Sequence, residues 1–347
     1  MADYITFQPS DYFNTKLYVA DQQDNRTITG VGFQPDFVWL RDRDQTVSHQ
    51  LYDAVRGALK SLASNTTNAE ATETDTLKAF ASDGFTLGTG WGNQTTGDKY
   101  VSWNWRAGAG QGSSNTDGSI NTTYTSVNTT AGFSISQYTG TGSAATIGHG
   151  LGAAPDLVII KSLQQTRIWI VGVEALGNWN KYLALSATDA EQTSSTYFPS
   201  APTSTVVNLG DGANVNNSSE NYIAYCFAEK KGFSKFGKYT GNGNGNGTFI
   251  YTGFKPAWVM VKRYDSGSED WRISDNKRFD QKNPIDKVLF ANLTNVESDA
   301  DVYDFASNGF KLRTTDGGMN ASGGTYIYMA FAEEPLVASN GDPATAR

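Results

Sequence analysis

The chain has 347 residues and a mass of 37.5 kDa, which is long enough for a large core and suggests roughly two or three domains. Its net charge of −8 and its pI near 4.9 argue against a surface that binds duplex nucleic acid, because such a surface must be basic. The single cysteine, Cys226, excludes an intramolecular disulfide, and no apolar run approaches the length of a membrane span. We therefore expect no disulfide scaffold, no nucleic-acid partner and no membrane insertion.

Three copies of one short stretch predict three buried strands. Each copy has a glycine and a proline, then an apolar run, then a basic residue. Proline fixes φ and cannot donate to a sheet ladder, so it fits the start of a strand, and the apolar run that follows predicts burial on both faces. The copies are Gly32 to Arg41, Gly152 to Lys161, and Gly253 to Lys262.

The segment after the first copy, from His49 to Gly57, contains apolar residues at helical spacing. Leu51, Val55 and Leu59 would share one helix face, but Gly57 interrupts the pattern. This segment therefore predicts a turn or a single helical turn.

Two Gly dipeptides between apolar residues predict β-hairpins. Asp83-Gly84 and Asn308-Gly309 suit a type I′ turn, which needs positive φ at both central positions. The corresponding stretch in the middle of the chain, Thr203 to Leu209, keeps the strand character without such a dipeptide, so we expect a different turn there.

Three segments that begin with a tyrosine predict strands with one large apolar face and one smaller, more polar face. Such one-sided strands are typical of an antiparallel sheet that packs on a core through its large face. The segments are Tyr100 to Trp105, Tyr222 to Phe227, and Tyr326 to Phe331. Tyr100 follows Pro35 by 65 residues, Tyr222 follows Pro155 by 67, and Tyr326 follows Pro256 by 70. This shared order and spacing predicts homologous units.

The predicted fold is all-β, with three tandem antiparallel β-sandwich or jelly-roll-like repeat units. The many glycines and the Thr, Asn and Ser residues favour short strands joined by turns. We expect unit 1 with its lead-in at residues 1–107, a Gly/Ser/Thr-rich flexible linker at 108–131, unit 2 at 132–229, unit 3 at 230–334, and a polar tail at 335–347.

These segments resemble a repeat family found in virion proteins of marine bacteriophages, often in tail fibres or other fibre-like structural proteins. The resemblance is carried in unit 1 by Pro35 to Arg41, Leu51 to Gly57, Ser82 to Leu87 and Tyr100 to Ala107, and in unit 3 by Gly253 to Lys262, Ser307 to Leu312 and Gly324 to Glu333. Unit 2 departs most, because it lacks the Asp-Gly turn and the Asp-x-x-Arg-Gly segment. The resemblance implies no catalytic residue.

The resemblance implies a bacteriophage virion structural protein, a tail or head fibre, knob or decoration that could contribute to host attachment. Its expected partners are other virion proteins, a host surface glycan or receptor, and further copies of itself, with a homotrimer favoured by analogy. The expected location is the virion after synthesis in the host cytoplasm. The alternatives are a soluble carbohydrate-binding module or lectin and a glycan-degrading hydrolase.

No enzymatic site, cofactor or metal is expected from the sequence. His49 and His149 lie in different units, and Cys226 lies in a predicted strand as a small packed residue. A hydrolase would need two acids across a cleft, and the acid pairs Asp42/Asp44 and Asp299/Asp301 are of a kind that is usually solvated.

Two tryptophans next to asparagines are the candidate glycan contacts. Trp91 with Asn93, and Trp179 with Asn180, lie in polar, turn-rich stretches outside the shared strands. An exposed indole offers an apolar face to a sugar ring while an amide offers hydrogen bonds. The competing interpretation is that these tryptophans pack beneath loops, because large aromatic side chains are mostly buried.

Overall fold

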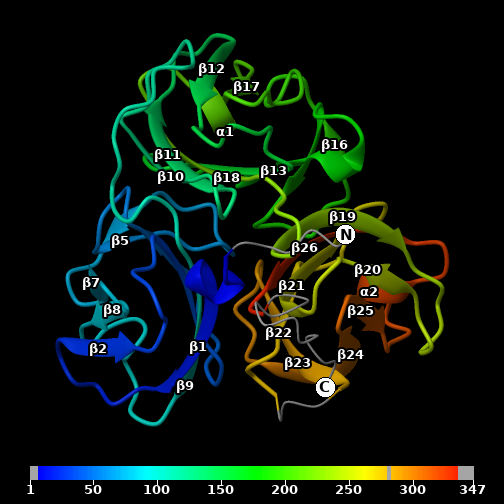
Figure 1. Cartoon of the computed structure of the whole chain (residues 1–347). Coiled ribbons are helices and arrows are strands. Elements are labelled where there is room, and N and C mark those ends of the chain that lie inside the picture. Colours follow the sequence, from blue (N-terminus) through cyan, green and yellow to red (C-terminus); the bar gives the residue numbers. More distant parts are fainter. Residues whose placement is uncertain (1–6, 280–282, 335–347) are drawn as a thin grey trace.

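The protein is almost entirely β-structure. A computed structural model describes residues 7–279 and 283–334 of the chain. Strands account for 42% of the residues and helices for 4%, and the sheets are antiparallel, which confirms the all-β prediction. Figure 1 shows that the strands gather in three lobes around a common centre. We name the lobes by their strands: the first lobe is β1 to β9, the second is β10 to β18, and the third is β19 to β26.

The first lobe contains two main sheets and a short ladder. Its elements are η1 (Pro9–Asp11), β1 (Phe13–Val19), β2 (Arg26–Thr29), β3 (Phe37–Asp42), β4 (Gln50–Asp53), β5 (Lys60–Ser61), β6 (Ala71–Thr72), β7 (Leu77–Ala81), β8 (Gly84–Leu87) and β9 (Lys99–Trp105). The larger sheet has the order β1-β9-β3-β4, the smaller has the order β2-β8-β7, and β5 pairs with β6.

The second lobe contains one seven-stranded sheet and one two-stranded sheet. Its elements are β10 (Tyr124–Asn128), β11 (Phe133–Thr139), β12 (Ala145–Gly148), β13 (Leu157–Ser162), β14 (Ile170–Val173), η2 (Glu174–Leu176), β15 (Lys181–Ala184), β16 (Gln192–Thr193), β17 (Val206–Leu209), α1 (Ala213–Asn216) and β18 (Asn221–Phe227). The larger sheet has the order β10-β11-β18-β13-β14-β15-β16, and β12 pairs with β17.

The third lobe forms one continuous eight-stranded sheet. Its elements are β19 (Ser234–Thr240), β20 (Phe249–Tyr251), β21 (Pro256–Arg263), β22 (Arg272–Asp275), β23 (Ile285–Phe290), β24 (Ser298–Ala306), β25 (Gly309–Leu312), α2 (Gly317–Asn320) and β26 (Thr325–Ala332). The strand order is β19-β26-β21-β22-β23-β24-β25-β20, so β19 and β20 lie at its two edges.

The three proline-led stretches form the strands β3, β13 and β21, as predicted. Every residue of β3 and β13 is buried, and so is every residue of β21 except Arg263 at its end. Burial on both faces explains why the apolar residues in these strands run continuously rather than alternating with polar ones.

The three tyrosine-led stretches form β9, β18 and β26, each of which lies beside a proline-led strand. The prediction of a one-sided strand is wrong, because the smaller face is buried as well. Ser102 and Asn104 on that face of β9 are fully buried, and the Asn104 amide donates to the Ser102 hydroxyl at 3.0 Å. Hydrogen bonds from the Asn104 amide nitrogen to the sheet thus offset part of the cost of burying these polar side chains.

Both predicted hairpins form, but with a different turn. Ala81 pairs with Gly84 and Ala306 pairs with Gly309, so each glycine begins the second strand instead of lying within the turn. Gly84 has a φ of 141°, and a Cβ added to it would lie 1.9 Å from the carbonyl oxygen of Ile28. The type I′ prediction is therefore wrong, and Gly84 is required for the close approach of β2.

The segment predicted as a turn or a helical turn at 49–57 begins as a strand. Residues 50–53 form β4, which pairs with β3 so that Phe37 faces Asp53. Sheet pairing with a neighbouring buried strand therefore outweighs the local helical spacing of Leu51 and Val55.

Four hydrophobic clusters show how the layers pack. Three of them lie within single lobes, between the outward face of the proline-led and tyrosine-led strands and the strands that cover this face. The fourth contains side chains from all three lobes and occupies the centre. The proline-led and tyrosine-led strands of each lobe are therefore buried on both faces, once inside their lobe and once against the other two lobes.

The segment predicted as a flexible linker, 108–131, is fastened to the first lobe at its start and to the second lobe further along. The buried Asp36 carboxylate accepts hydrogen bonds from the backbone N–H groups of Ala107, Ala109 and Gly110, at 2.6 to 2.9 Å. Further along, β10 adds a strand to β11. Ile120 forms a parallel bridge with Ile147 at the edge of β12. This segment therefore covers the edges of both sheets in the second lobe.

Candidate functional site

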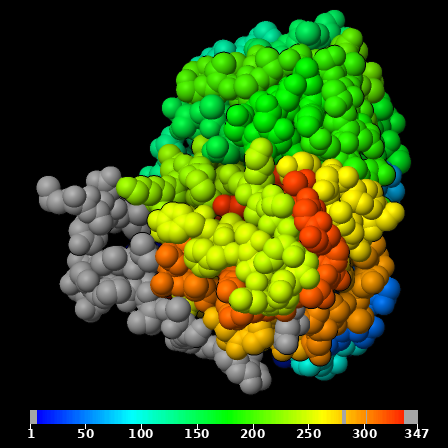
Figure 2. All heavy atoms as spheres, turned by 90° about the vertical axis from the view of Figure 1, so that its right-hand side faces the viewer, coloured from blue at the N-terminus to red at the C-terminus, as the bar shows by residue number. Residues whose placement is uncertain are grey.

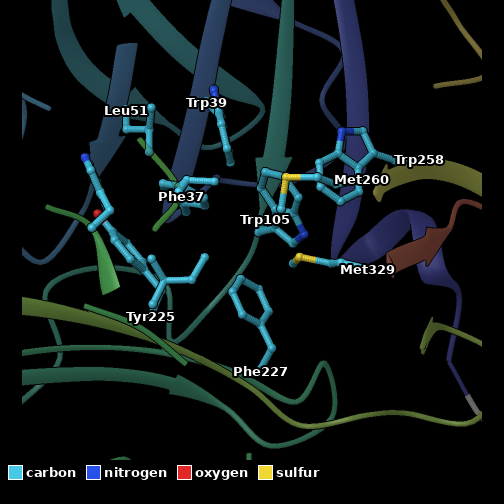
Figure 3. A pocket seen from close by; sticks show the side chains of 12 residues that line it. Phe37, Trp39, Leu51, Trp105, Tyr225, Phe227, Trp258, Met260 and Met329 are labelled. Carbon is cyan, nitrogen blue, oxygen red and sulfur yellow. The ribbon is translucent and has the colours of Figure 1, made fainter. Parts of the chain in front are cut away.

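The centre of the molecule, where the three lobes meet, is the largest concentration of aromatic side chains. Trp105 and Trp258 lie edge to face with ring centroids 5.5 Å apart, and Phe37 and Tyr225 are 4.8 Å apart. Figure 3 shows these rings converging from strands of different lobes. The space left between them has a volume of only about 10 Å³, about what one water molecule needs. The centre is therefore a packed core rather than a ligand pocket.

A buried polar network joins the second lobe to the first. The Tyr225 hydroxyl donates to an oxygen of Asp53 at 2.7 Å, and Arg56 Nε lies 2.5 Å from the same carboxylate. Arg56 also reaches Glu70 at 3.3 Å. Burial raises the pKa of Tyr225 well above its ordinary value, and the Asp53 charge adds to that effect. Tyr225 thus serves as a neutral hydrogen-bond donor across the joint.

A second network of the same kind joins the first lobe to the third. Trp103 Nε1 donates to Asp275 at 2.9 Å, and Arg278 Nε lies 2.5 Å from the same oxygen. Glu297 accepts from Arg278 at 2.8 Å and pairs with Arg43 at 2.6 Å. The Arg278 guanidinium also lies over the Trp103 ring, 5.5 Å from its centroid. The Asp275 and Arg278 side chains are completely buried, so they hold each other rather than a solvent ligand.

The second lobe has apolar residues where the other lobes have the ion pair. Asp53 pairs with Phe37 in the sheet register, Asp275 pairs with Trp258, and Val173 pairs with Leu157. The sequence Asp-x-x-Arg at 53–56 and 275–278 becomes Val173-x-x-Leu176. Met329 of the third lobe occupies the sheet position that Trp103 and Tyr225 occupy in theirs, opposite the proline-led strand. The second lobe has Val173 in place of the acid, and the third lobe has Met329 in place of the aromatic side chain that would donate to it.

One backbone hydrogen bond recurs at all three joints between lobes. In each, the N–H of a glutamate donates to the carbonyl oxygen of the residue two positions after the basic residue that ends a proline-led stretch. The bonds are Glu70 to Leu163 at 2.9 Å, Glu191 to Tyr264 at 2.8 Å, and Glu297 to Arg43 at 2.9 Å. They run from the first lobe to the second, from the second to the third, and from the third to the first. The three lobes therefore close into a directional ring.

At each joint, a ring nitrogen also donates a hydrogen bond to the other lobe, in the direction opposite to that of the glutamate N–H bond. The residues before β4, β14 and β22 are His49, Trp169 and Trp271, and all three are buried. His49 Nε2 bonds Phe290 O at 2.9 Å, Trp169 Nε1 donates to Ala63 O at 3.1 Å, and Trp271 Nε1 donates to Ala184 O at 2.9 Å. The three donors thus perform the same cross-lobe role.

His49 and His149 are both held as neutral structural groups. His49 Nδ1 accepts from Trp39 Nε1 at 2.9 Å, which leaves Nε2 as the donor to Phe290 O. Burial lowers the pKa of His49 well below its ordinary value, and the nearby Arg41 charge lowers it further. His149 accepts from the Leu151 N–H at 3.2 Å, and burial lowers its pKa. Neither imidazole has the solvent access that acid–base chemistry on a substrate requires.

Cys226 is a packed residue of β18, as predicted. Burial raises the pKa of its thiol to about 12, so the thiolate that reacts with disulfide reagents is scarce at neutral pH. We expect no labelling by a thiol reagent at pH 8 in the native protein and one equivalent of label after unfolding in denaturant. Measurement of the released chromophore checks this expectation, and rapid labelling of the native protein would contradict it.

The candidate glycan residues lie mostly inside the protein. Trp91 is partly buried, while Asn93 is fully buried and its amide donates to Gly88 O at 3.1 Å. Trp179 is 4% exposed, and its Nε1 donates to Glu174 at 2.6 Å. Asn180 is partly buried, with its N–H bonded to Asn178 Oδ1 at 2.9 Å. The structure does not bring the two Trp–Asn pairs together, and glycan contact stays a prediction for them.

Trp179→Ala is expected to lower the free energy of unfolding by about 3–5 kcal/mol. The reason is that the indole packs within the hydrophobic cluster of the second lobe, with Phe198 edge to face at a centroid distance of 5.7 Å. Chemical denaturation monitored by circular dichroism measures the change, with Trp91→Ala as the comparison. An unchanged midpoint for Trp179→Ala would contradict this packing role.

The acid pairs that the hydrolase alternative required hold turns or ion pairs. Asp42 accepts from the N–H groups of Asp44 and Gln45 at 2.9 and 3.0 Å, and Asp44 accepts from Lys99 N at 2.8 Å. Asp299 pairs with Lys287, and the side chain of Asp301 lies outside the described residues. Within residues 7–279 and 283–334, no group of three or more His, Cys, Asp or Glu side chains is arranged to hold a metal ion.

The cross-lobe contacts are the features that sequence reasoning missed. Glu70, Glu191 and Glu297 lie in loops of different sequence, so no motif marks them. The repeated Asp-x-x-Arg at Asp53 and Asp275 was a usable signal, because an acid and a base three residues apart can pair within one turn. The sequence did not show that an aromatic donor from another lobe completes each pair.

None of the short helices in the described part of the chain is long and apolar enough to cross a membrane.

Comparison with known proteins gives one match. Neither the comparison with curated proteins nor that with solved structures found a match. The family described as "Domain of unknown function (DUF7483)" matches residues 8–335, which include all three lobes. The chain therefore belongs to the DUF7483 family.

Proposed function

We propose that the chain is a non-enzymatic structural protein of a bacteriophage virion, a tail or head fibre, knob or decoration. Its architecture in this proposal is three homologous β-sandwich units closed into a ring. The resemblance of the repeated stretches to virion proteins motivates the virion role, and the contacts between the lobes support the structural one.

The common strand order supports the homology of the three units. Each lobe contains the same run of four strands, with the tyrosine-led strand second and the proline-led strand third. The runs are β1-β9-β3-β4, β11-β18-β13-β14 and β19-β26-β21-β22. The second layers correspond as well, because Ile28, Ile147 and Ile250 face Phe85, Val207 and Phe310 in β8, β17 and β25. Shared register in addition to shared sequence favours duplication of one unit.

The single observation that carries the structural role is the position of the buried Asp–Arg pairs. The Asp53–Arg56 and Asp275–Arg278 pairs have side chains no more than 1% exposed, and each receives a donor from another lobe. Groups of this kind in an enzyme would face a cleft that admits substrate. Here they lie in the joints, where a buried pair specifies how the lobes fit together.

Mass spectrometry of purified virions tests the proposed role. We expect peptides of this chain in particles that have been separated from soluble host and phage proteins on a density gradient. Peptides confined to the soluble fraction of infected cells, with none in the particle, would overturn the proposal.

Carbohydrate binding is the second candidate function, and the partly exposed indole of Trp91 favours it. A glycan array probed with the whole chain tests this candidate. Binding that Trp91→Ala abolishes while the fold is unchanged would support adhesion. If no glycan on the array binds, only the structural role remains as the proposal.

The homo-oligomer that the resemblance implies, with a trimer favoured, must use outer surfaces, because the central faces are occupied by the chain's own lobes.

A further inference from the structure

The three strands that carry Ile28, Ile147 and Ile250 each form the outer edge of a second layer, and the three edges differ. In the second lobe, β12 is covered by the chain itself: Ile120 N–H donates to Thr146 O at 2.9 Å, and Thr146 N–H donates to the Ser119 hydroxyl oxygen at 2.9 Å. An edge of β-structure that lacks such a cover exposes backbone donors and acceptors to other strands.

The edge of β2 in the first lobe carries polar protection. Thr27 and Thr29 are its outward residues, and both are exposed. Arg26 places a charge at the start of the strand and pairs with Asp21 at 3.2 Å. Charged residues on an edge strand are a common protection against pairing with another chain.

The edge of β20 in the third lobe has neither protection. Phe249 is 44% exposed and Tyr251 is 63% exposed, while Ile250 between them faces the core. Residues 247–254 include no charged residue and no proline. Among the described residues, β20 pairs only with β25. The strand is labelled on the right-hand side of Figure 1, the side that Figure 2 turns toward the viewer.

The backbone of Phe249 and Tyr251 points toward the open edge. Thr252 N–H donates to Asn308 O at 3.0 Å, and Leu312 N–H donates to Thr248 O at 3.1 Å. The even-numbered residues of this stretch therefore bond to β25 and its flanks. Because bonded and non-bonded pairs alternate in an antiparallel ladder, the N–H and C=O groups of Phe249 and Tyr251 face away from β25.

We propose that β20 is a contact surface for a second copy of this chain, with the two β20 strands pairing antiparallel about a twofold axis at Ile250. The pairing is self-complementary, since Phe249 of one copy lies opposite Tyr251 of the other, and each uses its outward N–H and C=O. The two Phe–Tyr pairs then pack side by side on the outer face, as aromatic cross-strand pairs do. The result is one sheet that continues through both molecules.

The comparison of β2, β12 and β20 rests on the proposed homology of the three units, but the contact does not depend on the virion role. Each contributing strand has only three residues, so the interface is small and we expect a reversible dimer of modest affinity. In an assembled particle, many such contacts would act together.

Sedimentation velocity of the full chain, from micromolar to submillimolar concentration, tests the proposal. We expect a monomer–dimer equilibrium that the double variant Phe249→Thr/Tyr251→Thr weakens about tenfold or more. Thr is the residue that β2 carries at both positions, so the variant keeps strand propensity and β2 shows that the fold accepts it. Val19→Thr, which changes another exposed apolar residue at 50% exposure, is the matched control and should dimerise like wild type.

Hydrogen exchange shows which segment of the chain forms the contact. We expect the segment that contains Phe249 and Tyr251 to exchange more slowly as the concentration of wild type rises, and the double variant to lose this dependence. A monomer at every concentration, or a dimer that the double variant leaves unchanged, would overturn the proposal. Glycan binding that requires Phe249 and Tyr251 without dimerisation would overturn it in favour of a sugar platform. Particle composition is measured separately, so failure of the dimer and failure of the virion role are distinguishable.

Discussion

Arg278→Leu is expected to lower the free energy of unfolding by about 3–5 kcal/mol. The guanidinium is completely buried between Asp275 and Glu297, and its removal leaves these two carboxylates without their shared cation in the joint between the first and third lobes. An unpaired buried charge costs far more than the pair contributes. Denaturant unfolding at pH 7, monitored by tryptophan fluorescence and circular dichroism, measures the loss.

The second lobe supplies the control for this prediction. Asp275→Val/Arg278→Leu installs the residues that the second lobe carries at the corresponding positions, Val173 and Leu176. Removing both members of the pair should cost less than Arg278→Leu alone, because Asp275 is no longer buried without its partner. A double variant that is less stable than the single one would show that the pair, rather than the isolated charge, dominates the stability of this joint.

Trp258→Ala is expected to lower the free energy of unfolding by about 3–5 kcal/mol and to weaken all three lobes together. The indole is fully buried and lies within 5.9 Å, centroid to centroid, of both Trp105 of the first lobe and Phe331 of its own. The cavity left by the truncation opens in the cluster that the lobes share, so no lobe keeps its inner face fully packed. Calorimetry should show one transition at a lower midpoint.

Hydrogen exchange of β13 and β18 makes this prediction specific to the shared core. Both strands belong to the second lobe, yet their inner faces contribute to the same cluster as Trp258. Their protection should fall in Trp258→Ala, and it should be unchanged in Val19→Ala, where the side chain is 50% exposed. Loss of protection confined to the third lobe would contradict a shared core.

The strands were the part of the fold that local sequence predicts well. Pro35, Pro155 and Pro256 mark strand starts because proline restricts its own backbone wherever it occurs. The Asp-Gly and Asn-Gly dipeptides indicated where the hairpins at Gly84 and Gly309 lie, but not their turn type, because the close approach of a third strand to each glycine is a tertiary contact. These signals are properties of a residue and its immediate neighbours.

The arrangement of the lobes was not predictable from the same signals. Tyr222 and Tyr225 are both aromatic and lie in one strand, but Tyr222 belongs to the second lobe's own cluster and Tyr225 to the shared centre. Nothing local distinguishes a core within a lobe from a core between lobes, since both bury apolar side chains at a period of two. The burial of Trp179 was not predictable from its neighbours either, because the polar residues beside it in the sequence do not keep its indole at the surface.

The closing joint between the third lobe and the first has a consequence for synthesis of the protein. Arg43 and Glu297 meet there although 254 positions separate them in the chain. Domains that emerge from a ribosome fold from the N-terminus onward, so the first lobe must wait for the last one before Trp103 and Arg43 receive their partners. During that wait its aromatic inner face is open to water and to other nascent chains. We therefore expect the yield of native protein to fall when this face stays uncovered for longer during synthesis, because exposed apolar surface favours aggregation.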